Sequence, residues 1–165
     1  MKKAELLQKV VRSRAEFEAL MSRFTDEQML QPALPGNWSP KDALAHMAWW
    51  ERRAHVVVSA ILTGRAPEYS IDESDVDNRN RQTYEENRPR PLAEIRNEEA
   101  VAYQALLALA ESLSDNELDN PGRFAMTEGR PLSVLVEWNT FAHYDEHMPD
   151  LRKMLLNPKS QTQNP

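Results

Sequence analysis

The chain has 165 residues, a formal net charge of −6 at pH 7 and no cysteine. The lack of cysteine excludes disulfides, thiolate metal ligands and thiol nucleophiles. The acidic balance argues against binding to a phosphate backbone, which requires a basic face, so no nucleic-acid partner is expected. The longest nearly uncharged stretch, residues 54–63, is too short to cross a bilayer, so no membrane association is expected. The first residues carry charges where a signal peptide would be apolar, which predicts a soluble, cytoplasmic protein.

Apolar residues recur at helical spacing in long segments, and all four glycines fall between these segments. No segment alternates between apolar and polar residues as a half-buried strand would. The pattern predicts four long amphipathic helices, over residues 2–24, 39–63, 91–113 and 131–156. The expected fold class is therefore all-α, a four-helix bundle formed by a single domain of residues 1–156. Residues 157–165 are predicted to be a polar, disordered tail.

The connection between the second and third predicted helices, residues 64–91, is long enough to cross the bundle. It is acidic at first, and residues 75–87 within it are compatible with a short helix that has little apolar face. A simple up-down-up-down order of the helices cannot be assumed from such a connection. We therefore expect a long crossover between the second and third helices.

Three of the four histidines are predicted to lie on inward-facing helix surfaces. His143 and His147 are four residues apart on the fourth predicted helix, so both lie on its apolar face. His46 lies on the flank of the apolar stripe of the second predicted helix, whereas His55 is half a turn out of phase and faces away. Two histidines at this spacing and a third from a facing helix are able to bind one metal ion. Imidazole nitrogens suit zinc, nickel or iron better than magnesium or calcium.

A second interpretation of the same three histidines is that they are hydrogen-bonded core residues without a metal. Most histidine pairs at this spacing do not bind an ion. Each buried imidazole has two nitrogens to satisfy, however, so three of them without a shared partner would be costly. The apolar surroundings therefore favour a metal site without excluding the structural interpretation.

Other residues near these histidines are weaker candidates. Trp38 and Trp50 flank His46 in sequence and either pack in the core or line an apolar ligand pocket. Asn139 precedes His143 by one turn and is a candidate partner of the metal ligands or of a substrate, or a satisfied buried amide. Glu146 lies at the edge of the histidine face and is a candidate general base, although a surface carboxylate is the stronger interpretation.

Two blocks of sequence carry a resemblance to a known family. Residues 36–51, GNWSPKDALAHMAWWE, resemble the signature G-x-W-S-x-K-D-x-L-A-H-x-x-x-W-E of DinB-like four-helix bundles, in particular the ClbS/DfsB branch. Residues 139–152, NTFAHYDEHMPDLR, resemble the fourth helix of that branch. The similarity extends over about residues 3–156.

The resemblance implies a DinB-like bundle with a divalent metal at His46, His143 and His147, the same residues that the helical phase selects. Relatives include thiol-dependent S-transferases, and the branch includes a protein that opens the cyclopropane of a genotoxic metabolite. Members are often dimers, so a homodimer is expected. A thiol would have to come from a low-molecular-weight cofactor, because the chain has no cysteine.

The expected function is that of a metal-dependent enzyme, either a thiol S-transferase or a hydrolase, that acts on a small electrophilic compound in stress or detoxification. The alternative is a non-catalytic bundle that binds or sequesters a small ligand and whose histidines are structural.

Overall fold

The computed structural model describes residues 1–69 and 75–156. The tail predicted for residues 157–165 lies outside the described residues. Within the described part, the chain is helical and forms no strand; an isolated bridge joins Leu34 to Trp38. The long helices of the bundle are α1 (Lys3–Met21), α3 (Pro40–Leu62), α5 (Leu92–Ser112) and the pair α7 (Leu132–Trp138) and α8 (Phe141–Leu156). The shorter helices are α2 (Asp26–Met29), α4 (Val76–Asn87) and α6 (Asp115–Asp119), with single 3₁₀ turns at Pro35–Asn37 and Ala125–Thr127.

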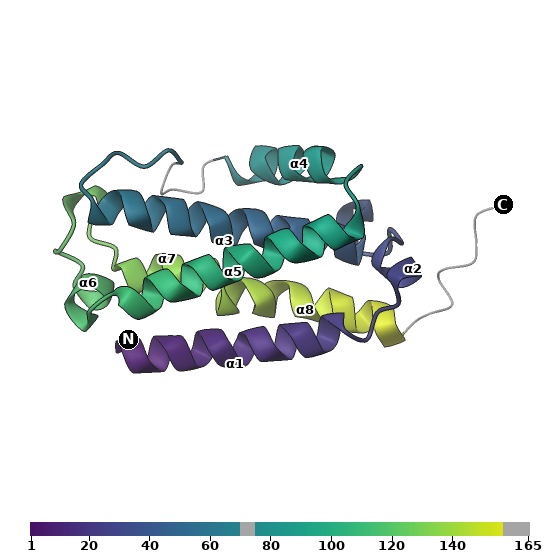
Figure 1. Cartoon of the computed structure of the whole chain (residues 1–165), viewed down its shortest axis with the longest axis horizontal. Coiled ribbons are helices and arrows are strands. Elements are labelled where there is room, and N and C mark those ends of the chain that lie inside the picture. Colours follow the sequence, from purple (N-terminus) through teal and green to yellow (C-terminus); the bar gives the residue numbers. More distant parts are fainter. Residues whose placement is uncertain (70–74, 157–165) are drawn as a thin grey trace.

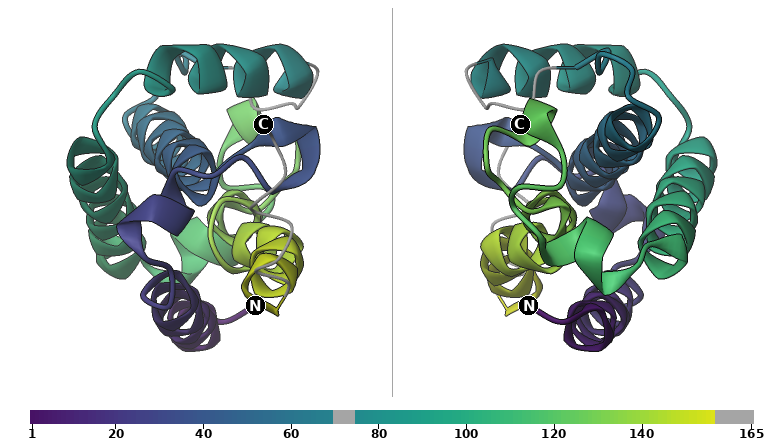
Figure 2. Two further views of the ribbon diagram at one scale, coloured as in Figure 1. Left: turned by 90° about the vertical axis from the view of Figure 1, so that its right-hand side faces the viewer. Right: turned by 90° about the vertical axis from the view of Figure 1, so that its left-hand side faces the viewer.

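The helices form a bundle of the predicted class, with a crossover between α3 and α5 (Figure 1). Helices α3 and α5 lie side by side and run in the same direction, while α1 and α8 run in the opposite direction. Seen along the bundle, α1, α3, α5 and α8 surround a common core, and α4 lies outside them (Figure 2). The long connection thus returns along the bundle through α4, which confirms the crossover expected from its length.

The start of α3 is defined by local sequence. Ser39 caps the helix: its side chain accepts a hydrogen bond from the Asp42 amide, and Asp42 Oδ2 accepts one from the Ser39 amide at 2.8 Å. Pro40 occupies the first turn, where a missing amide hydrogen costs nothing. The preceding loop turns at Gly36, whose φ of +70° is unfavourable for other residues. This arrangement brings Trp38 back over the first turns of α3, toward His46.

The fourth predicted helix is interrupted, which corrects the expectation of one continuous helix over residues 131–156. The break between α7 and α8 falls at two polar residues. Asn139 Nδ2 donates to the Leu135 carbonyl at 2.7 Å, and Thr140 Oγ1 donates to the Val136 carbonyl at 2.6 Å. Such side-chain bonds occupy carbonyls that a continuing helix would use, and they offer the backbone an alternative. Both histidines of this region lie on α8, so their relative spacing is unaffected.

The core has two apolar clusters, separated by a layer of buried polar residues. One cluster includes Val10 of α1 and Ala54 of α3. The other includes Phe17 of α1 and Met47 of α3. The layer between them contains four side chains that we call the Arg14 cluster: Arg14, Glu51, Glu99 and Tyr144. The same section of the bundle, toward α4, holds the predicted site histidines.

The Arg14 cluster is an ion-pair network within the bundle. Arg14 binds Glu99 through both terminal nitrogens, with Nη2 donating to Oε2 at 2.8 Å. The Tyr144 hydroxyl donates to Glu51, whose other carboxyl oxygen is buried without a partner among the described residues. Burial, and then the nearby Glu99 carboxylate, raises the pKa of the Glu51 side chain well above its ordinary value. The surroundings of Glu51 therefore favour its neutral form.

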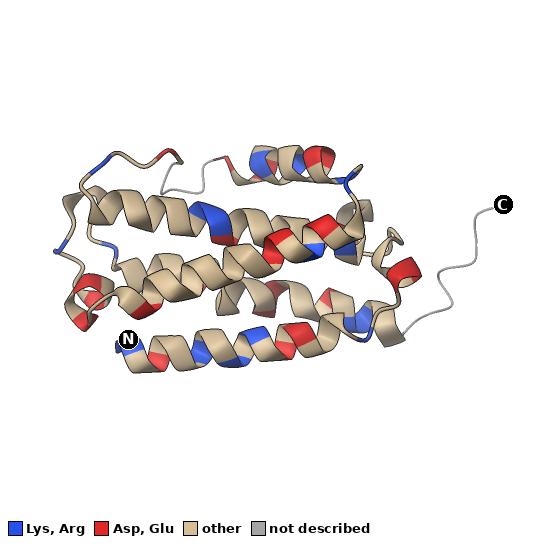
Figure 3. Cartoon of the chain, viewed as in Figure 1, with Lys and Arg blue, Asp and Glu red and all other residues tan. Residues whose placement is uncertain are grey.

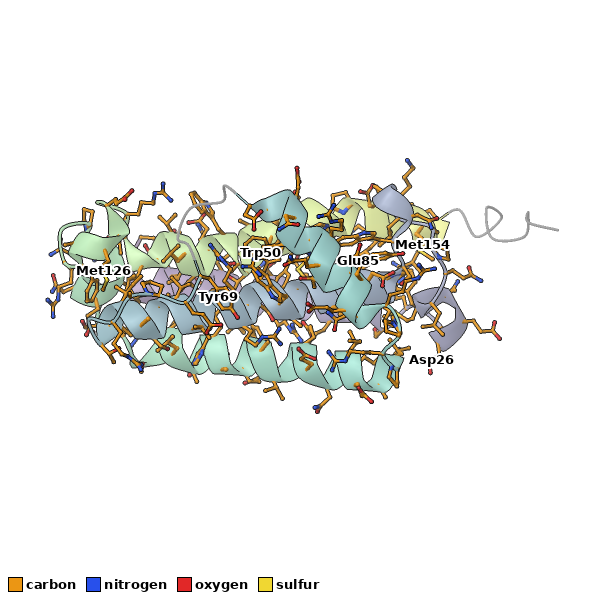
Figure 4. The ribbon with its side chains drawn as sticks, turned by 90° about the horizontal axis from the view of Figure 1, so that it is seen from above. Asp26, Trp50, Tyr69, Glu85, Met126 and Met154 are labelled. Atoms are coloured by element: carbon orange, nitrogen blue, oxygen red, sulfur yellow. The ribbon has the colours of Figure 1, made fainter. Side chains whose placement is uncertain are left out.

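Helix α4 is attached to α3 by polar and aromatic contacts. The Trp50 indole nitrogen donates to Asn80 Oδ1 at 3.0 Å, and Trp38 stacks on Tyr84 with 5.9 Å between the ring centroids. Lys41 Nζ donates to the Arg88 carbonyl at 2.7 Å and so binds the chain just after the helix ends. Seen from above, α4 crosses obliquely over α3 beside Trp50 (Figure 4). The short polar helix anticipated over residues 75–87 is confirmed.

In the view of Figure 3, acidic and basic residues are interspersed along α1, α4 and α5. Among the described residues, no helix is both long enough and apolar enough to cross a membrane.

Candidate metal centre

The structure brings together the three histidines selected from the sequence. His46 comes from α3, and His143 and His147 come from successive turns of α8. One ring nitrogen of each lies within 4.8 Å of the others, and the ring centroids are 4.7–4.9 Å apart. The Nε2 atoms of His46 and His143 are 2.8 Å apart. His55 is half-buried farther along α3 and is not part of this cluster.

The environment of the three imidazoles favours their neutral forms. Burial is the main reason that the pKa of His143 is lowered to about 3 and that of His46 falls well below 6.5. Burial also lowers the pKa of His147, against the opposing effect of the Glu146 and Asp150 carboxylates. Neutral imidazole has the lone pair that a metal ligand requires.

The donor set suits a divalent transition metal. Three convergent imidazole nitrogens are the ligand set of open zinc sites, in which further coordination positions are left for water or substrate. The Nδ1 atoms of His46 and His143 are buried and have no hydrogen-bond partner among the described residues. A neutral imidazole normally satisfies both nitrogens, so these two rings lack the partners expected of purely structural core histidines.

The histidines lie in a pocket of about 230 Å³ between α3, α4 and the α7–α8 pair. All four weaker candidates from the sequence line this pocket: Trp38, Trp50, Asn139 and Glu146. Trp50 and Asn139 are buried, whereas Glu146 is exposed. The Asn139 amide group is committed to the Leu135 carbonyl, which leaves its oxygen as the group available to a ligand.

Three residues that line the pocket were not identified as site residues from the sequence. They are Val76 and Asn80 on α4 and Trp138 at the end of α7. No local signal could have indicated Val76 or Asn80, since α4 has few apolar residues and reaches the site only by the crossover. The high tryptophan content was a weak signal for Trp138.

A second hollow of about 400 Å³ adjoins the histidines on the side of the Leu34–Trp38 loop. It shares Trp38, Glu146 and His147 with the first pocket. Its remaining lining residues are Leu34, Pro35, Gly36, Ala43, Asp150 and Leu151. His147 therefore lies between two hollows, and the centre is accessible from both.

Several solved structures share this fold. An uncharacterised protein from Escherichia coli UTI89 is 16% identical with a TM-score of 0.83, covering 95% of this chain and 94% of that chain. DfsB, described as a sibling lethal factor precursor, is 19% identical with a TM-score of 0.77 and 99% coverage of both chains. The colibactin self-resistance protein ClbS is 16% identical with a TM-score of 0.80, covering 93% of this chain and 95% of that chain. These neighbours support the resemblance to the ClbS/DfsB branch at the level of the fold.

The ClbS structure corrects one expectation from the sequence. ClbS was solved in complex with double-stranded DNA, which contradicts the expectation that no nucleic acid is a partner. That expectation relied on net charge. Net charge is a sum over the whole surface, so it does not exclude a local surface of suitable shape and charge.

No curated protein matches the sequence. The family model that describes the DinB superfamily matches residues 9–148, which include all three histidines of the cluster. Together with the helical architecture and the crossover, this match shows that the chain belongs to the DinB superfamily.

Proposed function

We propose that the chain is a metal-dependent enzyme that acts on a small electrophilic compound in a stress or detoxification role. The observation that carries the proposal is the cluster of three convergent imidazoles, two of them buried, that line an open pocket. Perturbed titratable groups that converge in a pocket are typical of functional sites. The described part of the core contains a second buried polar cluster around Arg14, but there the arginine is paired with the Glu99 carboxylate.

His46, His143 and His147 would hold the ion. A bound zinc, nickel or iron ion supplies Lewis acidity and lowers the pKa of a coordinated water or thiol. The pocket walls would orient the substrate through the Trp38 and Trp50 rings, and Glu146 at the mouth is positioned to accept a proton. The reaction would be hydrolysis or thiol transfer. For thiol transfer, a low-molecular-weight thiol must enter with the substrate, because the chain has no cysteine.

The alternative is a non-catalytic bundle that binds a small ligand. The 2.8 Å separation of the His46 and His143 Nε2 atoms favours it, because a hydrogen bond of this length satisfies one nitrogen of each ring without an ion. In that case the histidines would be structural, and the pocket would sequester its ligand.

Metal content distinguishes the two functions. The tag-free protein, dialysed against zinc, nickel or iron and then against buffer, is analysed for bound metal. The comparison is the triple variant His46→Ala/His143→Ala/His147→Ala, and His55→Ala is the matched control. We expect about one ion per chain in the wild type and in the control, and none in the triple variant. A metal-free wild type would overturn the enzyme proposal and leave the ligand-binding alternative.

A cytoplasmic location and a homodimeric state complete the proposal. The first follows from the composition, and the second from the family resemblance. Light scattering on the purified protein measures the dimer directly.

A further inference from the structure

The two hollows beside the histidines have an unusual charge composition. Among the described residues that line them, the only charged side chains are Glu146 and Asp150, and neither arginine nor lysine contributes. The side chains that line the hollows thus place negative charge near the mouth and offer no ammonium or guanidinium group to an anionic part of a ligand.

Trp138 provides a second, independent feature of the mouth. Its side chain is 44% exposed and lines the same pocket as Glu146. Other tryptophans at the site use their rings within the protein: Trp38 stacks on Tyr84, and Trp50 receives the Arg53 guanidinium 4.9 Å from its ring centroid. Within the described part of the chain, the Trp138 ring stacks on no other ring and receives no cation. Because the ring also lines the pocket, it presents an aromatic face that a bound ligand is able to contact.

The imidazoles form the buried part of the same lining, since His46 is 3% and His143 9% exposed. The pocket thus combines a buried wall of imidazoles with an exposed indole and an exposed carboxylate.

We infer that the ligand of this site carries a cationic group, such as an ammonium, which binds at the mouth between the Trp138 ring and the Glu146 carboxylate. An aromatic face attracts a cation through its quadrupole, and a carboxylate adds direct charge attraction. The substrate class is then a small amine-bearing or quaternary ammonium compound with an uncharged reactive end toward the histidines. The inference deepens the proposed function and rests on it for the reaction, but not for the binding.

Three probes of nearly equal shape test the charge preference. Choline is the cation, 3,3-dimethylbutan-1-ol is its neutral counterpart, and 3,3-dimethylbutanoate is the anion. Each is titrated at pH 7.5 into ¹⁵N-labelled protein, both metal-free and zinc-loaded, and the indole N–H resonance of Trp138 is followed. The Trp138→Phe variant assigns that resonance by its loss.

We expect choline to bind at least about fivefold more tightly than the neutral probe, and the anion to bind most weakly. Glu146→Gln should remove most of this preference. Asp145→Asn, which neutralises an exposed neighbouring carboxylate that does not line either hollow, should preserve it. Trp138→Ala should weaken choline binding more than Trp138→Phe, because phenylalanine keeps an aromatic face.

Equal binding of choline and its neutral counterpart, tighter binding of the anion to metal-free protein, or an unchanged preference in Glu146→Gln would each overturn the inference. Metal content measured on the same samples shows separately whether the proposed metal-dependent function holds. Stoichiometric zinc without a cation preference would support the metal centre and overturn the cation-binding site. A cation preference in protein that binds no metal would support the cation-binding site and contradict the proposed metal-dependent enzyme.

Discussion

Two buried polar clusters occupy the same section of the bundle, and they differ in how their charges are balanced. Both draw on adjacent residues: Glu51 follows Trp50 on α3, and Tyr144 follows His143 on α8. The Arg14 cluster contains its own counter-charge, since Arg14 binds Glu99 through two nitrogens. The histidine cluster contains three imidazoles and no ion pair, and burial lowers the pKa of each. The comparison teaches that burial alone does not mark a functional site, whereas ring nitrogens that converge beside an open pocket indicate one.

The largest expected effect comes from breaking the paired cluster. Arg14→Ala leaves Glu99 buried without its cation, and we expect a loss of about 3–5 kcal/mol in the free energy of unfolding. Urea denaturation measures it. Arg12→Ala is the control, because Arg12 pairs with Glu16 at an exposed site where such pairs contribute under about 1 kcal/mol. The double change Arg14→Ala/Glu99→Gln should recover part of the loss. Similar losses for Arg14→Ala and Arg12→Ala would contradict the structural role assigned to the cluster.

The second prediction concerns zinc binding to the histidine cluster. Zinc at a free concentration one hundred times its dissociation constant should raise the free energy of unfolding by about 3 kcal/mol, because only the folded chain brings the three ligands together. His143→Ala should abolish this gain, and His55→Ala should retain it. Thermal unfolding with and without zinc provides the measurement. A gain of equal size in His143→Ala would show that zinc acts elsewhere.

The third prediction concerns the loss of stability at low pH. The folded pKa values of the three histidines lie below 6.5, so the unfolded chain takes up protons that the folded chain excludes. Stability that is complete above pH 6.5 is therefore lost as pH falls toward about 3, the folded value for His143. We expect a slope of about 1 kcal/mol per pH unit from His143 alone. Urea denaturation of the metal-free protein between pH 6.5 and 5 measures it, as the difference in slope between the wild type and His143→Ala. An identical slope in His143→Ala would contradict the assignment.

The smallest expected effect belongs to Glu51 and has the opposite sign with pH. The pKa of this carboxyl is raised in the folded chain. Its contribution to the free energy of unfolding is therefore fully present below pH 4.5 and is lost as pH rises through the folded pKa. Glu51→Gln mimics the neutral form and keeps an acceptor for the Tyr144 hydroxyl. At pH 5 we expect Glu51→Gln to change the free energy of unfolding by less than about 1 kcal/mol. At pH 9 we expect the variant to be more stable relative to the wild type than at pH 5. A loss of several kcal/mol at both pH values would show that Glu51 is ionised and paired.

Much of the bundle was predictable because its signals are local. Ser39 and Asp42 mark the start of α3 through a capping box, and helical spacing places His143 and His147 on one face of α8. The connection over residues 64–91 indicated a crossover by its length alone. The family resemblance selected the same three histidines independently.

The break between α7 and α8 was not predicted, although its cause lies in the sequence. Asn139 and Thr140 have ordinary helix-compatible neighbours, and their bonds to the preceding turn compete only weakly with a helix. Periodicity carries no information on such a small difference in free energy.

By itself, the sequence determined which segments are helical and which helix faces are apolar, since both depend on neighbours within a few residues. The approach of His46 to within hydrogen-bonding distance of His143, 97 positions away, was decided only by the tertiary structure. The same holds for α4, whose Asn80 meets Trp50 because the crossover returns over α3. These contacts join distant segments, and the packing that brings them together is a property of the whole core.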